Sequence, residues 1–77
     1  MKGINTKELK DIRQDLDDIR SRIESVKEDA EAYYDEKSEK WQEGDNGQFM
    51  NEKIGELDEA INDIESLIEK IDYIAEE

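Results

Sequence analysis

The segment Gly44-Asp45-Asn46-Gly47 decides the fold, because it interrupts two long amphipathic runs. Apolar residues before it recur at alternating spacings of three and four, and the run after it repeats this alternation in opposite phase. Such spacing places the apolar side chains along one stripe of an α-helix. The first stripe comprises Leu9, Ile12, Leu16, Ile19, Ile23, Val26, Ala30 and Tyr33, and the second comprises Met50, Ile54, Leu57, Ile61, Ile64, Ile68, Ile71 and Ala75. The sequence therefore predicts a helix, a turn and a second helix.

The helix boundaries follow from signals at the ends of the two runs. Asn5 is suited to cap the first helix, and Glu8 three residues later completes a capping box. No glycine or proline follows until position 44. We therefore expect one helix over about 5–43, a turn at 44–47 and a second helix over about 47–75. The chain, 1–77, is expected to form a single domain.

Two glycines have expected roles in this arrangement. Gly44 follows the first helix directly, where a residue with positive φ is common, so it is predicted to end that helix. Gly55 lies inside the second helix, where glycine costs about 1 kcal/mol relative to alanine. It is expected either to allow close packing near Lys37 or Trp41, or to be a tolerated surface glycine.

The two stripes match when the chain folds back on itself about the turn. Facing residues should then have numbers that sum to about 91, which places Ile23 beside Ile68. We therefore predict an all-α fold, an antiparallel two-helix hairpin that resembles a coiled coil. The same register leaves Leu9 and Ile12 without partners, since they would face positions beyond the end of the sequence.

The second helix carries one apolar row more than a two-helix seam can cover. This row repeats every seven residues beside the main stripe and widens the apolar face. We expect two hairpins to associate as a homodimer that forms a four-helix bundle. Docking of the open face on a different protein is the alternative. The residues expected to mediate self-association are Leu9, Ile12, Ala60, Leu67 and Ile74.

The composition excludes most catalytic and metal chemistry. The chain has 77 residues and contains neither cysteine nor histidine. It can form no disulfide and no thiolate or histidine metal site. A chain of this length seldom has a core worth more than about 3–5 kcal/mol, and small proteins usually need such a cross-link or metal for added stability. The usual acyl-transfer triads and thiol nucleophiles are also absent. We expect no enzymatic activity, no cofactor, and no catalytic or metal-binding residue.

The charge is strongly negative and unevenly distributed. Of the formal net charge of −13, residues 1–43 carry −4 and residues 44–77 carry −9. Carboxylates along a rigid rod imitate a polyanion and suit the basic groove of a nucleic-acid-handling protein, whereas they disfavour direct binding to nucleic acid or to anionic membranes. A purely solubilising role is the alternative. The candidate partner-binding acidic face comprises Glu52, Glu56, Asp58, Glu59, Asp63, Glu65, Glu69 and Asp72.

Aromatic side chains gather near the turn. Tyr33, Trp41 and Phe49 are expected to close the tip of the hairpin, where lysines replace the aliphatic residues of the seam. Tyr34 lies off the seam, and tyrosine is a common anchor at protein interfaces. The candidate contact residues at the tip are Tyr34, Glu43, Asp45 and Asn46.

Residues 33–48 carry a pattern of the form Asp-x-(Arg/Lys)-Ser-x-x-Trp-Gln-Glu-Ser-x-x-Gly. The matching residues are Asp35, Lys37, Ser38, Trp41, Gln42, Glu43 and Gly47, while Gly44 stands where serine is usual. The segment resembles one found in small acidic helical-hairpin proteins of bacteriophages and prophages. The resemblance implies a phage setting and a hairpin, and it carries over no catalytic residue. Small acidic phage proteins often inhibit host defence nucleases or restriction systems, so the resemblance implies an inhibitor by analogy.

Charge and resemblance together predict an acidic protein-binding module. Its expected partner is a host nuclease, a DNA-binding protein or another defence protein, which it inhibits as a DNA mimic. The alternative is a structural or adaptor coiled-coil dimer whose acidity has no role in mimicry. The sequence has no long apolar run and no signal-peptide core, so a cytoplasmic protein is expected, in the host cell cytoplasm if a phage encodes it.

Overall fold

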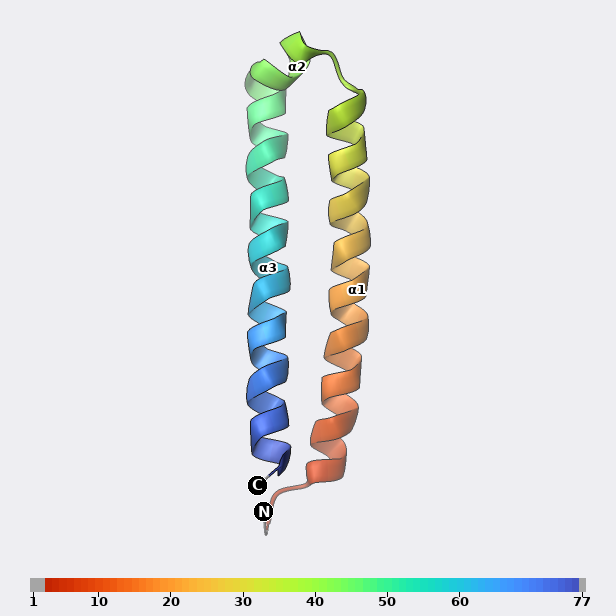
Figure 1. Ribbon diagram of the computed structural model, residues 1–77, viewed down its shortest axis with the longest axis vertical. Coiled ribbons are helices and arrows are strands. Elements are labelled where there is room, and N and C mark those ends of the chain that lie inside the picture. Colours follow the sequence, from red (N-terminus) through yellow and green to blue (C-terminus); the bar gives the residue numbers. More distant parts are fainter. Residues whose placement is uncertain (1–2, 77) are drawn as a thin grey trace.

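The computed structural model describes residues 3–76 and consists of two long helices joined at a compact corner (Figure 1). The helices are α1 (Thr6–Glu36), α2 (Glu39–Glu43) and α3 (Asp45–Glu76), and these residues form no strand. α1 and α3 run antiparallel side by side, and the molecule measures 59 × 15 × 12 Å. The predicted all-α hairpin is confirmed. None of the helices has an apolar stretch long enough to cross a membrane, as far as residues 3–76 are concerned.

α1 begins as its capping signal predicts. The side-chain oxygen of Asn5 accepts a hydrogen bond of 2.9 Å from the backbone N–H of Glu8. This bond satisfies one of the N–H groups that have no partner in the first turn of a helix. Asn5 therefore fixes where the hairpin begins.

α1 ends at Glu36, whereas the sequence led us to expect a helix that continues to about residue 43. Lys37 and Ser38 adopt extended backbone conformations, and the Ser38 hydroxyl accepts a 3.2 Å hydrogen bond from the N–H of Trp41. Serine is a preferred N-cap, and the side-chain bond starts a new helix, α2, instead of prolonging the old one. The expected turn at 44–47 is therefore a wider corner that begins at Lys37.

Gln42 and Trp41 hold the corner against the end of α1. The side-chain amide of Gln42 donates to the carbonyl oxygens of Tyr34 at 2.8 Å and Lys37 at 3.3 Å. The Trp41 ring packs edge-on against Tyr33 and Tyr34, with ring centroids 5.9 and 6.3 Å apart. The amide thus adds hydrogen bonds at the carbonyl end of the helix, where the Tyr34 oxygen also accepts from the backbone N–H of Lys37 at 3.1 Å.

Gly44 does not have the expected conformation, whereas Gly55 fits one of its two expected roles. Gly44 has φ −81° and extended ψ, so the prediction of a positive φ was wrong. Gly47 is buried, and a Cβ atom there would collide with the backbone of Gln42. Gly55 is exposed and a Cβ atom would meet nothing within 4 Å, which makes it the surface glycine of the two alternatives.

The register of the hairpin differs from the expected one by six residues. Three ion pairs join α1 to α3, namely Arg13–Asp72, Arg20–Glu65 and Lys27–Asp58, and the residue numbers in each pair sum to 85 rather than to about 91. The chain therefore folds back near Gln42, because α2 belongs to the corner and not to the first long helix. As a result, the first turn of α1 lies beside the end of α3 (Figure 1), and the overhang expected at Leu9 and Ile12 is absent.

The core is thin and is supplied by α3. Ile61, Ile68 and Ile71 are its buried apolar side chains, while α1 has no buried residue. α1 is rotated about its axis relative to a symmetric seam, so one half of its apolar stripe faces α3 and the other half lies in solvent. The exposed half comprises Ile12, Ile19, Val26 and Tyr33.

Candidate protein-binding surfaces

The hairpin has two long sides with different chemistry. One side, here called the ion-pair side, carries the three α1–α3 ion pairs at seven-residue intervals. The other, here called the apolar side, carries the exposed half of the α1 stripe and the neighbouring row of α3, because these positions lie across each helix from the ion-pair row. The apolar side comprises Ile12, Ile19, Val26 and Tyr33 on α1 and Leu57, Ala60, Leu67 and Ile74 on α3.

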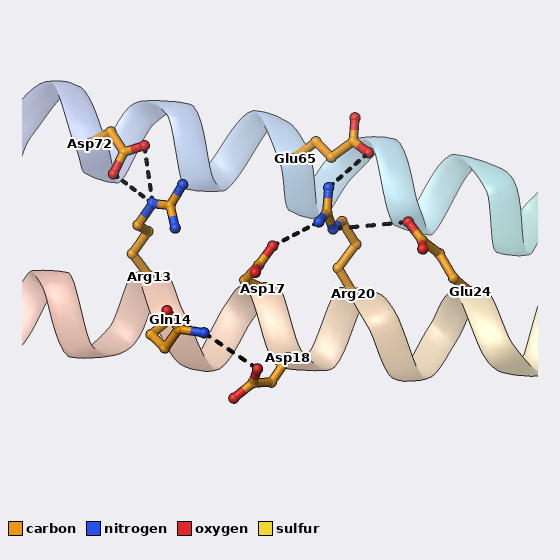
Figure 2. A network of polar contacts seen from close by, with 8 residues as sticks. All are labelled: Arg13, Gln14, Asp17, Asp18, Arg20, Glu24, Glu65 and Asp72. Atoms are coloured by element: carbon orange, nitrogen blue, oxygen red, sulfur yellow. Dashed lines mark hydrogen bonds and ion pairs between the residues drawn. The ribbon is translucent and has the colours of Figure 1, made fainter.

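Arg20 is the centre of the ion-pair side (Figure 2). Its guanidinium contacts Asp17 at 2.7 Å and Glu24 at 3.9 Å on its own helix, and Glu65 at 3.4 Å on α3. Two turns towards the chain ends, Arg13 Nε donates to both carboxylate oxygens of Asp72, at 2.9 and 3.1 Å. These side chains are partly exposed, so each pair contributes about 0.2–1 kcal/mol.

Lys27 completes the row near the corner. Its Nζ atom lies 3.0 Å from a carboxylate oxygen of Asp58. This hydrogen bond raises the pKa of Lys27, with further support from the charges of Asp58, Glu31 and Glu24. Because a raised folded-state pKa favours the protonated form, the lysine keeps its charge at neutral pH, and its contribution is lost as the pH rises through its raised pKa.

The eight predicted acidic residues divide into two groups. Asp58, Glu65 and Asp72 pair with α1, and Glu56 pairs with Lys53 at 3.0 Å on α3 itself. This last contact raises the pKa of Lys53. Within residues 3–76 the other four make no ion pair, and all four side chains are exposed. These four are Glu52, Glu59, Asp63 and Glu69.

The unpaired carboxylates lie on more than one face of α3. Glu52 and Glu59 are two turns apart on the face that points away from α1. Glu69 is also exposed, but it lines the groove on the ion-pair side together with Arg13 and Asp72. No charged side chain among the described residues is buried. Half of the predicted acidic residues thus form ion pairs within the hairpin, and the other half are free to contact a partner.

The tip differs from the expected contact surface. Glu43, Asp45 and Asn46 are exposed at the end of α2 and the start of α3, as a contact surface requires. Tyr34 is half-buried, packs on Trp41 and lines a shallow groove with Asn51 and Ile54. It lies against the hairpin and supports the corner.

The expected aromatic plug is only partly formed. Trp41 is half-buried, but Tyr33 and Phe49 are 47% and 62% exposed, so they do not close the tip. Lys37 Nζ lies 4.4 Å from the Tyr33 ring centroid, a cation–π contact at the surface. The rotation of α1 explains why Tyr34, and not Tyr33, packs at the corner, because it turns Tyr33 outward and brings Tyr34 against α3.

The apolar side exposes several large side chains in one line. On α1, Ile12, Ile19 and Val26 are 38%, 41% and 56% exposed, and Leu67 on α3 is 44% exposed. An apolar groove between the helices is lined by Ile19, Arg22, Ile23, Val26 and Leu57. Of the residues expected to self-associate, Ile12 and Leu67 are exposed, whereas Leu9, Ala60 and Ile74 are half-buried.

The sequence contains the signal that separates the two sides, although the heptad stripes alone do not show it. Basic residues follow the first stripe at positions 13, 20 and 27, and acidic residues follow the second at 58, 65 and 72. Each set repeats every seven residues, so each forms one row on its helix. Matching the rows in antiparallel order gives the sum of 85 and places Ile19, Val26 and Tyr33 on the side away from the ion pairs.

Comparison with protein-family models, with curated proteins and with solved structures found no match to this chain. Residues 3–76 bring together no group of three or more acidic side chains that could hold a metal ion. Function is therefore inferred from the outer acidic face and the apolar side of the hairpin.

Proposed function

We propose that the chain is an acidic protein-binding module that inhibits a nucleic-acid-handling or defence protein of a bacterial host. The unpaired carboxylates of α3 carry the proposal. Glu52, Glu59 and Glu69 lie along one helix, are exposed and take no part in the ion pairs that hold α1 to α3. A row of free carboxylates on a stiff support attracts the basic groove of a protein that binds nucleic acid.

The size of the charge bears on how such a module acts. Thirteen net negative charges over a length of 59 Å amount to about one per 4.5 Å, whereas duplex DNA carries one per about 1.7 Å. The field of one hairpin is therefore weaker than that of DNA. It serves to steer a basic partner into contact, and local side chains such as Glu43, Asp45 and Asn46 at the tip add specificity.

The test reverses three unpaired charges of α3 together. The variant Glu52→Lys/Glu59→Lys/Glu69→Lys replaces none of the residues that form the α1–α3 ion pairs. Wild-type protein is immobilised and exposed to bacterial lysate at low salt, and bound proteins are eluted with rising salt and then with duplex DNA. We expect a DNA-binding protein or nuclease to elute with DNA, and we expect the triple variant to bind it roughly tenfold more weakly.

The matched control places the same charge change on the other helix. Asp11, Asp18 and Glu28 are exposed on α1 and take part in none of the ion pairs of residues 3–76. The variant Asp11→Lys/Asp18→Lys/Glu28→Lys should retain the partner if the α3 face makes the contact. Equal loss in both variants, or a partner that ignores salt and DNA, contradicts polyanion mimicry.

A structural or adaptor role is the second candidate, and the apolar side favours it. Exposed Ile19, Val26 and Leu67 suit a contact that excludes water rather than one that depends on charge. Such a contact should persist at high salt, since screening acts on charges and not on apolar burial. Partner binding that the α3 triple variant retains at about 0.5 M salt, where the screening length is roughly 4 Å, would favour this role.

A further inference from the structure

The chain exposes more surface than a compact protein of its mass. Its accessible surface is 5955 Å², whereas a folded monomer of 9.0 kDa exposes about 4,850 Å². The excess is larger than the about 800 Å² that each partner buries in a stable protein complex. With three buried apolar side chains, the single hairpin has a small core, and covering the apolar side would enlarge it.

We propose that a second copy of this chain covers the apolar side, and that the two hairpins pack with their corners at the same end. Two arrangements related by a two-fold axis bring the same side of two hairpins face to face. With the axis along the rod, α1 packs on α3 of the partner and the corners lie together. With the axis across the rod, α1 packs on α1 and α3 on α3, and the corners lie at opposite ends.

The register of the hairpin fixes the contacts of the same-end arrangement. Within one chain, the residues level with each other on α1 and α3 have numbers that sum to 85. Rotation about an axis along the rod does not change the height of any residue along the rod. Residues that lie at the same height in the two copies therefore also have numbers that sum to 85. To within one residue, Ile19 then meets the partner's Leu67, and Val26 meets the partner's Ala60. One further heptad along, Ile12 meets the partner's Ile74. The apolar rows of the two copies thus face each other along the interface.

The charges beside the apolar rows are complementary in this arrangement. Asp15 is level with the partner's Lys70, and Arg22 is level with the partner's Asp63. None of these four residues has an ion pair within residues 3–76 of its own chain. At the next level, Asp29 faces the partner's Glu56, an unfavourable pair that the Lys53–Glu56 contact offsets.

The opposite-end arrangement has a less favourable charge distribution. It places α3 beside the α3 of the partner, and residues 44–77 carry −9 in each copy. The same-end arrangement instead places this segment beside α1, within residues 1–43 that carry −4. Repulsion between the helices therefore favours corners at the same end.

The absence of cysteine from the sequence allows a direct test of orientation. The single variants Ile19→Cys and Leu67→Cys are mixed in equal amounts, oxidised mildly and separated by mass. The same-end dimer should give mainly the mixed disulfide between the two variants, because the linked positions face each other. Outward-facing Ser21→Cys and Ser66→Cys form the control mixture, which should give little cross-linking. Predominant self-linked Ile19→Cys dimers, or no excess over the control, would overturn the proposal.

A second measurement tests the charge pairing and the mass. Sedimentation of the wild type should give twice the 9.0 kDa chain mass. Arg22→Asp and Asp63→Arg should each raise the dimer dissociation constant roughly tenfold, and the double variant should recover most of the loss. A monomeric wild type, or a double variant weaker than both single ones, would refute the dimer. Neither result depends on the proposed function, because Glu52, Glu59 and Glu69 are unchanged.

Discussion

At the scale of single residues, two glycines of the same helix, α3, have opposite structural roles. Gly47 is buried where α2 meets α3, and its missing Cβ lets the Gln42 backbone approach. Gly55 is exposed in the middle of α3 and has no close neighbour. Only the first of these glycines is required by the fold.

Replacing each glycine by alanine should therefore change stability in opposite directions. Gly47→Ala must move backbone and should destabilise the protein by about 1–3 kcal/mol. Gly55→Ala removes a flexible residue from a helix interior and should stabilise it by about 0.5–1 kcal/mol. Urea unfolding followed by circular dichroism, at one fixed protein concentration, measures both changes. A neutral Gly47→Ala would show that the corner is looser than described.

The residues of the resemblance segment have recognisable structural tasks. Ser38 caps α2, Trp41 packs on both tyrosines, Gln42 binds the end of α1, and Gly47 permits the close approach. The pattern thus describes how a corner is made. It would be retained for the fold whatever the protein binds.

At the scale of the helices, the rotation of α1 depends on the ion-pair row. Arg20 spans from its own helix to α3 and contacts three carboxylates (Figure 2). Long basic side chains can cross the seam with their charged ends at the surface, which keeps this face of α1 against α3. The apolar residues on the adjacent face are consequently turned into solvent.

Removing the centre of the row should weaken the pairing of the two helices. Arg20→Met keeps the apolar stem but leaves Asp17, Glu24 and Glu65 without their cation, so we expect a loss of about 1 kcal/mol. Lys10→Met, at an exposed position without an ion pair in the described chain, removes the same charge and should be nearly neutral. Thermal unfolding of both variants at low salt gives the comparison. Equal losses would mean that net charge, and not the network, is responsible.

The sequence predicts the two long helices and the cap at Asn5, since these depend on local spacing. The apolar stripes alone do not yield the register, because the sequence predicts that the first helix ends at Gly44, whereas Ser38 already begins a new helix. Because the first long helix ends earlier than expected, the pairing of the two long helices is shifted by six residues. The division of the acidic face likewise depends on which carboxylates α1 reaches, and only the register determines that.

At the scale of the whole molecule, repulsion competes with the ion pairs. The α1–α3 ion pairs together contribute at most about 3 kcal/mol, while 13 excess negative charges repel each other throughout the rod. Salt weakens both effects, but the repulsion involves more charges. Repulsion therefore dominates the response of the fold to ionic strength.

Added salt should consequently stabilise the protein. Raising sodium chloride to about 0.3 M shortens the screening length to roughly 6 Å and should raise the melting temperature by about 5 °C. Circular dichroism melts at one protein concentration measure the shift. A melting temperature that falls with salt would show that the ion pairs outweigh the repulsion.

Dimerisation would also change the charge that a partner meets. Two hairpins side by side carry 26 net negative charges over 59 Å, or about one per 2.3 Å, which approaches the one per about 1.7 Å of duplex DNA. The proposed dimer is thus a closer imitation of a polyanion than one hairpin. The two proposals support each other, although each is tested separately.

The start of α1 and the end of α3 lie at the same end of the rod, opposite the corner (Figure 1). A biotin tag, a fluorophore or a bead attached near either terminus is therefore held at one end of a rod 59 Å long. The corner then projects away from the support, and both long sides of the hairpin remain open to solution. The molecule can be anchored through either terminus without hiding the surfaces on which its interactions depend.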